Sequence, residues 1–251
     1  MERILAVIPA RYASTRFPGK PLAIIAGKSM IQRVYEQARK CATITEVIVA
    51  TEDARILEHV NGFGGRCFMT SDKHRSGTDR IGEVIDQLSA QNPSSTFDIV
   101  INIQGDEPML EPDQLEELLS GFEDSTAHIC SLQKEIHDIS EWKNPNVVKV
   151  VNDQNGYALY FSRSPIPFSR DQQETIWPGT VKHYKHIGLY AYRMSTLQSI
   201  LKLPTGKLEA AESLEQLRWM ENGYRLKMIV TDYETIAVDC PEDLSKLTNK
   251  I

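Results

Sequence analysis

Three cationic side chains lie close together near the start of the chain, directly after an apolar segment. Arg11, Arg16 and Lys20 fall within ten residues, and Ile4–Ile8 before them has the composition of a buried strand. Arginine offers a planar fork to a phosphate group, whereas lysine offers a compact charge. Ligands of open α/β sheets bind beyond the carboxyl ends of the strands. The cluster therefore predicts a polyphosphate site, the alternative being a solvated turn with ordinary surface charge.

Two common phosphate-binding patterns are missing from the sequence. There is no G-x-x-x-x-G-K-[ST], and no G-x-G-x-x-G follows the first predicted strand. These absences argue against a P-loop and against a dinucleotide site of the Rossmann type. Side-chain cations must then do much of the work that glycine-rich backbone does in those folds.

A carboxylate follows a second apolar segment. Asp106 lies in the sequence Gln-Gly-Asp-Glu-Pro, directly after the predicted strand Ile99–Ile103. Magnesium in phosphate-transfer sites is usually held by one or two carboxylates together with substrate phosphates, so Asp106 is a candidate ligand. The alternative is an aspartate that forms a turn after the strand. Its neighbour Glu107 is a weaker candidate, as are Glu242 and Asp243, which we expect to complement the positive end of a last helix.

A small polar turn precedes a predicted helix that begins at Asp79. Ser76, Gly77 and Thr78 combine two hydroxyl groups with the free amides of a helix start, which suits recognition of a base edge or a sugar hydroxyl. The alternative is a plain helix N-cap at Ser76 or Thr78. Arg75, just before the turn, is treated as peripheral.

The segments that must position these residues alternate between strand and helix patterns. This alternation predicts an α/β fold, a Rossmann-like α/β/α arrangement in three layers with a mixed sheet. The expected elements are strands at Ile4–Ile8, Val47–Ala50, Cys67–Thr70, Ile99–Ile103, Val147–Val151, Ala158–Ser162, His186–Tyr192, Lys227–Val230 and Thr235–Val238, and helices at Met30–Lys40, Asp53–Phe63, Asp79–Leu88 and Leu208–Asn222. We expect one domain over residues 1–251, with a β-rich region inserted at about 130–195 that contains a polar loop at 170–179.

Composition excludes several classes of protein. With 251 residues, 41% of them hydrophobic, the chain can bury a sizeable core, and its net charge of -6 argues against a general nucleic-acid binder. The four cysteines lack C-x-x-C spacing, so neither a zinc site nor a disulfide framework is expected. No apolar run reaches the length of a membrane span, and no signal peptide is recognised at the amino terminus, so we predict a cytoplasmic protein without membrane or nucleic-acid partners.

Several longer motifs resemble one enzyme family nearly from end to end. They are PARYASTRFPGKPL, SGTDR, NIQGDEP, ALYFSRSPIP, YKHIGLYAYR, LEQLR and VDCPEDL. Together they closely resemble the 3-deoxy-manno-octulosonate (Kdo) cytidylyltransferases, the enzymes that synthesise CMP-Kdo. The first motif and the Gly-Asp pair alone also resemble the wider nucleotidyltransferase family that activates sugars with nucleoside triphosphates.

The resemblance implies roles for individual residues. Asp106 and Asp239 would bind Mg²⁺, and Lys20, Arg11, Asp106 and Asp239 would form the catalytic set. For Asp239 the alternative is a helix N-cap. The CTP nucleotide would be held by Arg11, Ser14, Arg16, Lys20, Ser76, Gly77 and Thr78.

The acceptor sugar acid would be held by a second set of residues, namely Arg80, Gln104, His186, Tyr190, Glu212 and Gln216. The fork of Arg80 suits a carboxylate. Glu212 and Gln216 are four apart in the predicted helix Leu208–Asn222, which would put both on one face, although a solvated face is the alternative. A metal shared by His183 and His186 is not expected, because residues three apart on a strand point to opposite faces. We expect Leu159, Phe161, Leu189 and Tyr192 in the core.

The implied activity is transfer of CMP from CTP to the anomeric hydroxyl of Kdo, with release of pyrophosphate, for lipopolysaccharide biosynthesis. The resemblance also implies a homodimer built through the inserted region. Two alternatives remain open from the residues: a related sugar acid as acceptor, such as 8-amino-Kdo or a sialic acid, and a nucleotide-binding regulator without catalysis.

Overall fold

The computed structural model describes residues 2–13, 17–92, 96–168, 170, 181–234, 238 and 240–244. The chain forms two compact units. The first comprises Met1–Glu116, Arg193–Leu201 and Thr235–Ile251, and the second comprises Glu117–Tyr192 and Lys202–Glu234. Each unit is described in turn.

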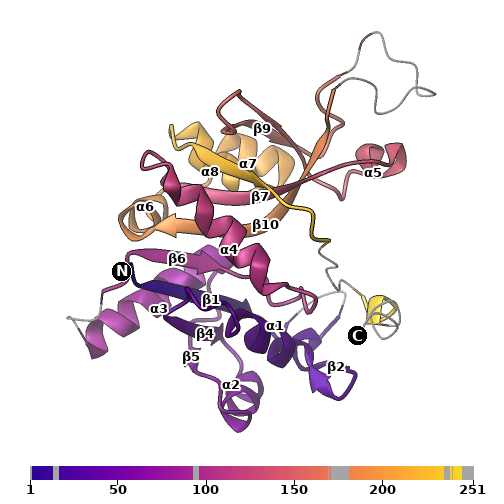
Figure 1. Cartoon of the computed structure of the whole chain (residues 1–251). Coiled ribbons are helices and arrows are strands. Elements are labelled where there is room, and N and C mark those ends of the chain that lie inside the picture. The colour runs from indigo at the N-terminus through magenta and orange to yellow at the C-terminus, as the bar shows by residue number, and fades with distance from the viewer. Residues whose placement is uncertain are drawn as a thin grey trace. The chain divides into compact units, whose positions relative to one another are not determined.

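The first unit contains a parallel sheet of strands β6 (Ile99–Asn102), β1 (Ile4–Ala10), β4 (Glu46–Thr51) and β5 (Cys67–Met69), in that order (Figure 1). Nearly every residue of β1 is buried, as expected for a strand covered on both faces. The register pairs Ala10 with Thr51 and Val7 with Asn102. The chain segments that leave β1 and β4 at their carboxyl ends are therefore neighbours.

Four of the helices that the structure describes lie wholly in this unit, and three of them begin at a side-chain cap. They are α1 (Met30–Ala38), α2 (Ala54–Gly62), α3 (Gly77–Gln91) and α6 (Met194–Ile200). Ser29 caps α1, Asp53 caps α2, and Ser76 with Asp79 forms a capping box on α3, each satisfying backbone amides that the helix leaves unpaired. The sequence placed the start of α3 at Asp79. The helix begins two residues earlier, because Ser76 takes the cap position.

A short hairpin and the end of the chain complete the first unit. The 3₁₀ turn η1 (Lys20–Leu22) leads into the hairpin of β2 (Ile24–Ile25) and β3 (Lys28–Ser29). Ile25, Met30 and Val238 form a buried cluster, against which Phe17, Met109 and Leu244 also pack. This apolar contact fixes the described carboxyl-terminal residues beside the segment that follows β6.

The second unit has a mixed sheet. Strand β7 (Ile129–Glu135) pairs with β10 (Tyr184–Arg193) in antiparallel fashion and with β11 (Leu226–Val230) in parallel fashion. Strand β8 (Lys149–Asn152) pairs with β10 and with β9 (Ala158–Ser162). The chain enters this unit within α4 (Pro112–Ser120), which leads to the short turn η2 (Gly121–Glu123), and helix α5 (Ile139–Lys143) follows β7.

The predicted helix Leu208–Asn222 is wrong, because two helices stand in its place. Helix α7 (Lys207–Glu212) ends at Ser213, whose φ of 53° is left-handed, and α8 (Gln216–Glu221) follows. The prediction of Leu159 in the core is also wrong. Leu159 lies on β9 and is 60% exposed, whereas Phe161 on the same strand is fully buried. On a regular strand, residues two apart share one face. The pairing with β8 passes over Leu159, because Tyr160 pairs with Val151 and Ala158 pairs with Asn152, so Leu159 is the extra residue of a bulge and is exposed.

The other predicted strands and helices are present, with ends shifted by a few residues. The predicted strand Thr235–Val238 and the polar loop at 170–179 fall largely outside the described residues, and the single-domain organisation stays a prediction. Among the described helices, none combines the length and apolar character that a membrane crossing requires.

The break at Ser213 generates a stability prediction. A β-branched residue is strongly disfavoured at positive φ, so we expect Ser213→Val to lower the free energy of unfolding by about 1–2 kcal/mol. Ser213→Gly should leave it unchanged within about 1 kcal/mol, because glycine adopts this conformation freely. Urea unfolding of both variants checks the expectation. Equal stability of the two variants would mean that the left-handed turn does not constrain the chain.

Candidate functional site

The loop after β1 carries the predicted phosphate-binding cations. Gly19, at a φ of 73°, donates its N–H to the carbonyl oxygen of Tyr12 at 2.9 Å, which closes the loop at its base. A β-carbon at Gly19 would lie 3.2 Å from the Tyr12 ring, so both the backbone conformation and the space require glycine. Arg11 is exposed and donates from Nη2 to the carbonyl oxygen of His74 at 2.9 Å. Ser14 and Arg16 lie outside the described residues.

Lys20 and Asp106 meet directly. The Lys20 Nζ donates to Asp106 Oδ2 at 2.6 Å and to the Val238 carbonyl oxygen at 2.8 Å. The Val238 N–H in turn donates to the carbonyl oxygen of Asp106 at 3.0 Å. The side chains of Lys20 and Asp106 are 15% and 28% exposed, so a ligand can reach both. Three segments that are distant in the sequence thus converge just beyond the carboxyl end of β6.

The carboxylates at this place differ in charge state. Burial, together with the neighbouring charge of Asp106, raises the pKa of Glu107 to about 8. Glu107 is 7% exposed and is therefore mainly protonated at neutral pH. Among the described residues at the end of β6, the carboxylate that pairs with Lys20 therefore has no second charged carboxylate as its chain neighbour.

The donor set fits one kind of metal ion. Among the residues that the structure describes, no three His, Cys, Asp or Glu side chains gather where they could hold a metal. Magnesium does not need such a cage, since it commonly takes one or two carboxylates and completes its shell with water and substrate phosphates. Asp106, with an accessible carboxylate, fits that arrangement. Asp239 lies outside the described residues, but its chain neighbour Val238 is the residue bonded to Asp106.

The turn before α3 is organised as a helix cap. Ser76 Oγ accepts from the Asp79 N–H, and Asp79 Oδ2 accepts from the Ser76 N–H, both at 3.1 Å. Thr78 is buried. A β-carbon at Gly77 would lie 3.2 Å from Pro9, so glycine lets the helix approach the end of β1 closely. The cap that sequence analysis named as the alternative is therefore formed, and nucleotide contacts at Ser76, Gly77 and Thr78 stay a prediction.

Arg80 has protein partners. Its side chain is 1% exposed, with Nη2 at 2.9 Å from Glu52 Oε2 and Nη1 donating to Thr70 Oγ1. Burial is the main influence on the Arg80 pKa and lowers it, while the charge of Glu52 opposes that shift. Gln104 lies half-buried directly after β6. Both residues belong to the first unit, whereas the remaining predicted acceptor residues belong to the second.

In the second unit, His186 and Tyr190 are brought together on β10. Their ring centroids are 5.2 Å apart, and Tyr190 also packs edge-on against Trp219. His186 Nε2 shares a hydrogen bond of 2.9 Å with Ser131 Oγ on β7. Burial lowers the pKa of His186 to about 3 and raises that of Tyr190 well above its usual value. Both side chains are therefore neutral at physiological pH.

The argument that Glu212 and Gln216 share a helix face is wrong, because Ser213 ends α7 between them. Glu212 instead accepts from Ser162 Oγ at 2.6 Å and from the Arg163 N–H at 2.8 Å, which ties α7 to the end of β9. Gln216 is buried in the first turn of α8. The ring of His183 packs on Trp142, whereas the ring of His186 contacts those of Phe161 and Tyr190.

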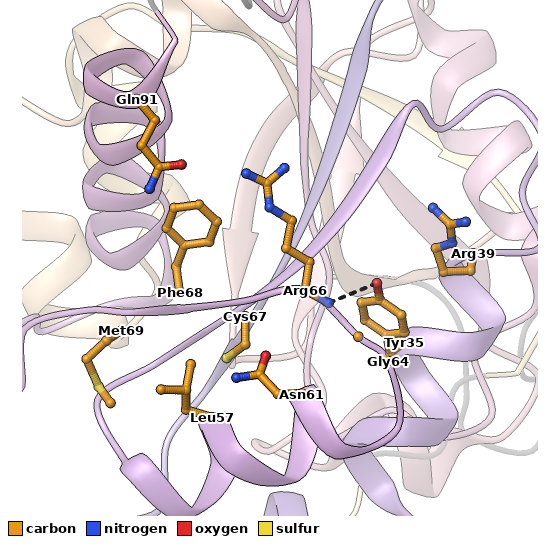
Figure 2. Close-up of a pocket in the computed structure, with 11 residues that line it drawn as sticks. Tyr35, Arg39, Leu57, Asn61, Gly64, Arg66, Cys67, Phe68, Met69 and Gln91 are labelled. Carbon is orange, nitrogen blue, oxygen red and sulfur yellow. Dashed lines mark hydrogen bonds between the residues drawn. The ribbon is translucent and has the colours of Figure 1, made fainter.

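A pocket of about 710 Å³ lies elsewhere in the first unit, at the amino end of β5 (Figure 2). Its lining includes Arg66, Cys67 and Phe68 but none of the described candidate residues. Burial raises the pKa of the Cys67 thiol to about 12, and Arg66 is already paired with Glu46. The pocket therefore offers no activated nucleophile, and it is at the opposite strand ends from Asp106.

Sequence reasoning missed the residues that hold the loop in place. Glu52 accepts from the Tyr12 N–H at 3.0 Å, and the Arg55 guanidinium lies 3.3 Å from the centre of the Tyr12 ring. A signal was available for Glu52, which follows the buried parallel strand β4 at once, whereas Asp106 lies four residues beyond the end of β6. The pairing of Glu52 with Arg80 had no signal in the sequence, because the two residues are far apart along the chain.

The fold and this constellation define a nucleotidyltransferase class of protein, and comparisons with known proteins agree. The family model described as cytidylyltransferase matches residues 5–234. The 3-deoxy-manno-octulosonate cytidylyltransferase of Parabacteroides distasonis is 49% identical over 250 residues, covering 98% of this chain and 97% of the relative. The protein of that name from Geobacter sulfurreducens is 48% identical over 254 residues, covering 99% of each chain.

Solved structures give the same result. A structure of CMP:2-keto-3-deoxy-manno-octonic acid synthetase complexed with CTP has a TM-score of 0.89 and 43% identity, covering 99% of this chain and 98% of that one. A 4-diphosphocytidyl-2C-methyl-D-erythritol synthase, at 13% identity and a TM-score of 0.66, shares the fold. The predicted α/β nucleotidyltransferase fold is confirmed. The chain belongs to the 3-deoxy-manno-octulosonate cytidylyltransferase family.

The buried neutral His186 generates a pH prediction. In the unfolded chain a histidine takes up a proton below about pH 6.5, whereas the folded protein resists protonation until about pH 3. The contribution of His186 to the free energy of unfolding is therefore fully present above pH 6.5 and decreases as the pH falls below that value. At pH 4.5 the decrease is roughly 2–3 kcal/mol. We expect His186→Gln to lose correspondingly less stability between pH 7.5 and pH 4.5. Urea unfolding at both pH values measures the difference, and parallel losses in the two proteins would contradict the assignment.

Proposed function

We propose that this protein transfers CMP from CTP to the anomeric hydroxyl of Kdo, releasing pyrophosphate. The observation that carries the proposal is the junction of Lys20, Asp106 and Val238 beyond the end of β6, next to the loop of Arg11. Cations suited to a triphosphate beside a carboxylate suited to a magnesium ion support the proposal. The names of the curated relatives and of the solved CTP complex support cytidine as the base and Kdo as the acceptor.

The chemistry needs no covalent intermediate on the enzyme. The Kdo hydroxyl attacks the α-phosphorus of CTP in line, and pyrophosphate leaves on the opposite side. Such transfers depend mainly on positioning and on stabilisation of charge. Arg11 and Lys20, with Arg16, neutralise the β- and γ-phosphates and so stabilise the leaving group. Lys20 is held between Asp106 and a backbone carbonyl, so its ammonium group stands beside the proposed metal ligand.

Asp106 and Asp239 are the proposed magnesium ligands. Bound Mg²⁺ supplies charge neutralisation and orientation of the phosphate oxygens. Support comes from the chain itself: Asp239 directly follows Val238, whose N–H is bonded to Asp106. The protonated Glu107 keeps a further negative charge away from the phosphates. Asp106 and Asp239 would orient the ion without acting as general bases.

Neutral groups of the second unit, namely His186, Tyr190 and Gln216, are proposed to contact hydroxyl groups of the acceptor. Glu212 would shape the acceptor site through its bonds to Ser162 and Arg163. A homodimer, a cytoplasmic location and a role in lipopolysaccharide biosynthesis belong to this proposal as well. They rest on the resemblance to the family.

Pyrophosphate release tests the proposed reaction. With Mg²⁺ present, we expect release only when CTP and Kdo are both supplied, with ATP, GTP and UTP giving little. Parallel reactions with 8-amino-Kdo and a sialic acid separate the close acceptors. Release with one of these but not with Kdo would replace the acceptor while keeping the reaction class. CTP binding without release for any acceptor would make the protein a nucleotide-binding regulator.

Asp106→Asn tests the metal assignment. Loss of the anionic ligand should weaken the binding of Mg²⁺, so the charge of the phosphates is less well neutralised. We therefore expect kcat to fall by about 10²–10³-fold. The ion pair between Asp106 and Lys20 is partly exposed, so its loss should change the free energy of unfolding by no more than about 1 kcal/mol. Asp113→Asn, at an exposed position of α4, is the matched control. Near-normal turnover of Asp106→Asn at the same magnesium concentration would rule out the assigned role.

A further inference from the structure

A chain of contacts in the first unit leads from a buried arginine to the phosphate loop. The Arg80 guanidinium on α3 is paired with Glu52 at 2.9 Å, and the two side chains are 1% and 15% exposed. Oε1 of the same carboxylate accepts from the Tyr12 N–H at 3.0 Å. Glu52 therefore faces Arg80 with one oxygen and the loop backbone with the other.

Tyr12 is itself held on several sides. Its ring lies under the Arg55 guanidinium, and its carbonyl oxygen accepts from the Gly19 N–H at 2.9 Å. Arg11 precedes Tyr12, and Lys20 follows Gly19. Tyr12, whose N–H Glu52 binds, and Gly19, which bonds to Tyr12, are therefore chain neighbours of the two described cations of the loop.

We propose that Arg80 is a positioning residue, which acts through Glu52 and Tyr12 to fix Arg11 and Lys20 for the triphosphate. This inference rests on the function proposed above and gives Arg80 a role other than binding the carboxylate of the acceptor. The register supports it, because β1 and β4 pair Ala10 with Thr51 and so bring Tyr12 beside Glu52. A buried guanidinium such as that of Arg80 needs a partner of opposite charge, because an unpaired buried charge strongly destabilises the folded state.

The surroundings of Arg80 leave little access for an acceptor. Nη1 and Nη2 face Thr70 and Glu52. Its remaining donor, Nε, is buried and has no hydrogen-bond partner among the described residues. A sugar carboxylate would have to enter this enclosed place, whereas the contact through Glu52 to the loop is already made.

Two variants test the positioning role while keeping the protein folded. The double variant Arg80→Met with Glu52→Met removes both charges together, which avoids leaving one of them buried and unpaired. Arg80→Lys keeps the charge but loses the fork. For the double variant we expect KM for CTP to rise by about 10- to 100-fold, since small misplacements of binding groups are costly. Arg80→Lys should lie between wild type and the double variant, and KM for Kdo should change little in either.

Hydrogen exchange provides a readout that does not depend on turnover. In the double variant, the amides of Tyr12 and Gly19 should exchange at least tenfold faster, while the β6 amides and the urea midpoint stay close to wild type. Arg66→Met, which removes an arginine paired with Glu46 elsewhere in the unit, is the matched control and should change none of these.

Three outcomes would overturn the inference. An increase in KM for Kdo alone, with unchanged loop exchange, would make Arg80 an acceptor ligand. Faster exchange throughout the first unit would make the pair merely structural. If exchange at Tyr12 and Gly19 and KM for CTP were both unchanged, Arg80 would have no role in positioning the loop. If the wild-type protein releases no pyrophosphate with any acceptor, the proposed function fails, while exchange at Tyr12 and Gly19 still decides the positioning role.

Discussion

The ion pair between Lys20 and Asp106 is the interaction on which the arrangement of the candidate site depends. It joins the loop after β1 to the segment after β6, and Lys20 also bonds to the backbone of Val238. Val238 also packs against Ile25 and Met30 in a buried apolar cluster, which helps to fix its backbone beside Lys20. The contact is partly exposed, so its own contribution to stability is small, on the order of 1 kcal/mol or less. Its importance lies in fixing where a cation and a carboxylate stand before a substrate arrives.

A triphosphate needs concentrated positive charge, which a folded protein must offset until the ligand binds. In the first unit, each described cation at or near the proposed phosphate site has a protein partner. Lys20 faces Asp106, Arg80 faces Glu52, and Arg11 bonds to the carbonyl oxygen of His74. These partners limit the self-repulsion of the cations and hold their side chains in few conformations, which lowers the entropy cost of binding. The net charge of -6 is therefore compatible with a site for an anion, because local placement of charge matters more than the total.

The sequence predicted the parts that local patterns determine. Strands β1, β4 and β6 are nearly continuous apolar runs, and Asp106 follows one of them, so the strand end and its carboxylate were both predictable. The break at Ser213 was not, because the residues on both sides favour a helix and only one backbone angle interrupts it. Nor was the pairing of Arg80 with Glu52, which depends on the strand register and on α3 packing. Long-range contacts of this kind leave no periodic pattern in one sequence.

The aromatic cluster of the second unit contains titratable side chains that are held neutral. His186 and Tyr190 lie among Phe161 and Trp219, where burial disfavours a charge on either side chain. Hydroxyl groups of a sugar need directed donors and acceptors, and such groups keep their strength where water is excluded. A charged histidine there would have to be desolvated, so the unit is built to keep it neutral. The described cations of the proposed phosphate site thus belong to the first unit, whereas the described aromatic cluster of the second unit is uncharged and suits the hydroxyl groups of the proposed acceptor.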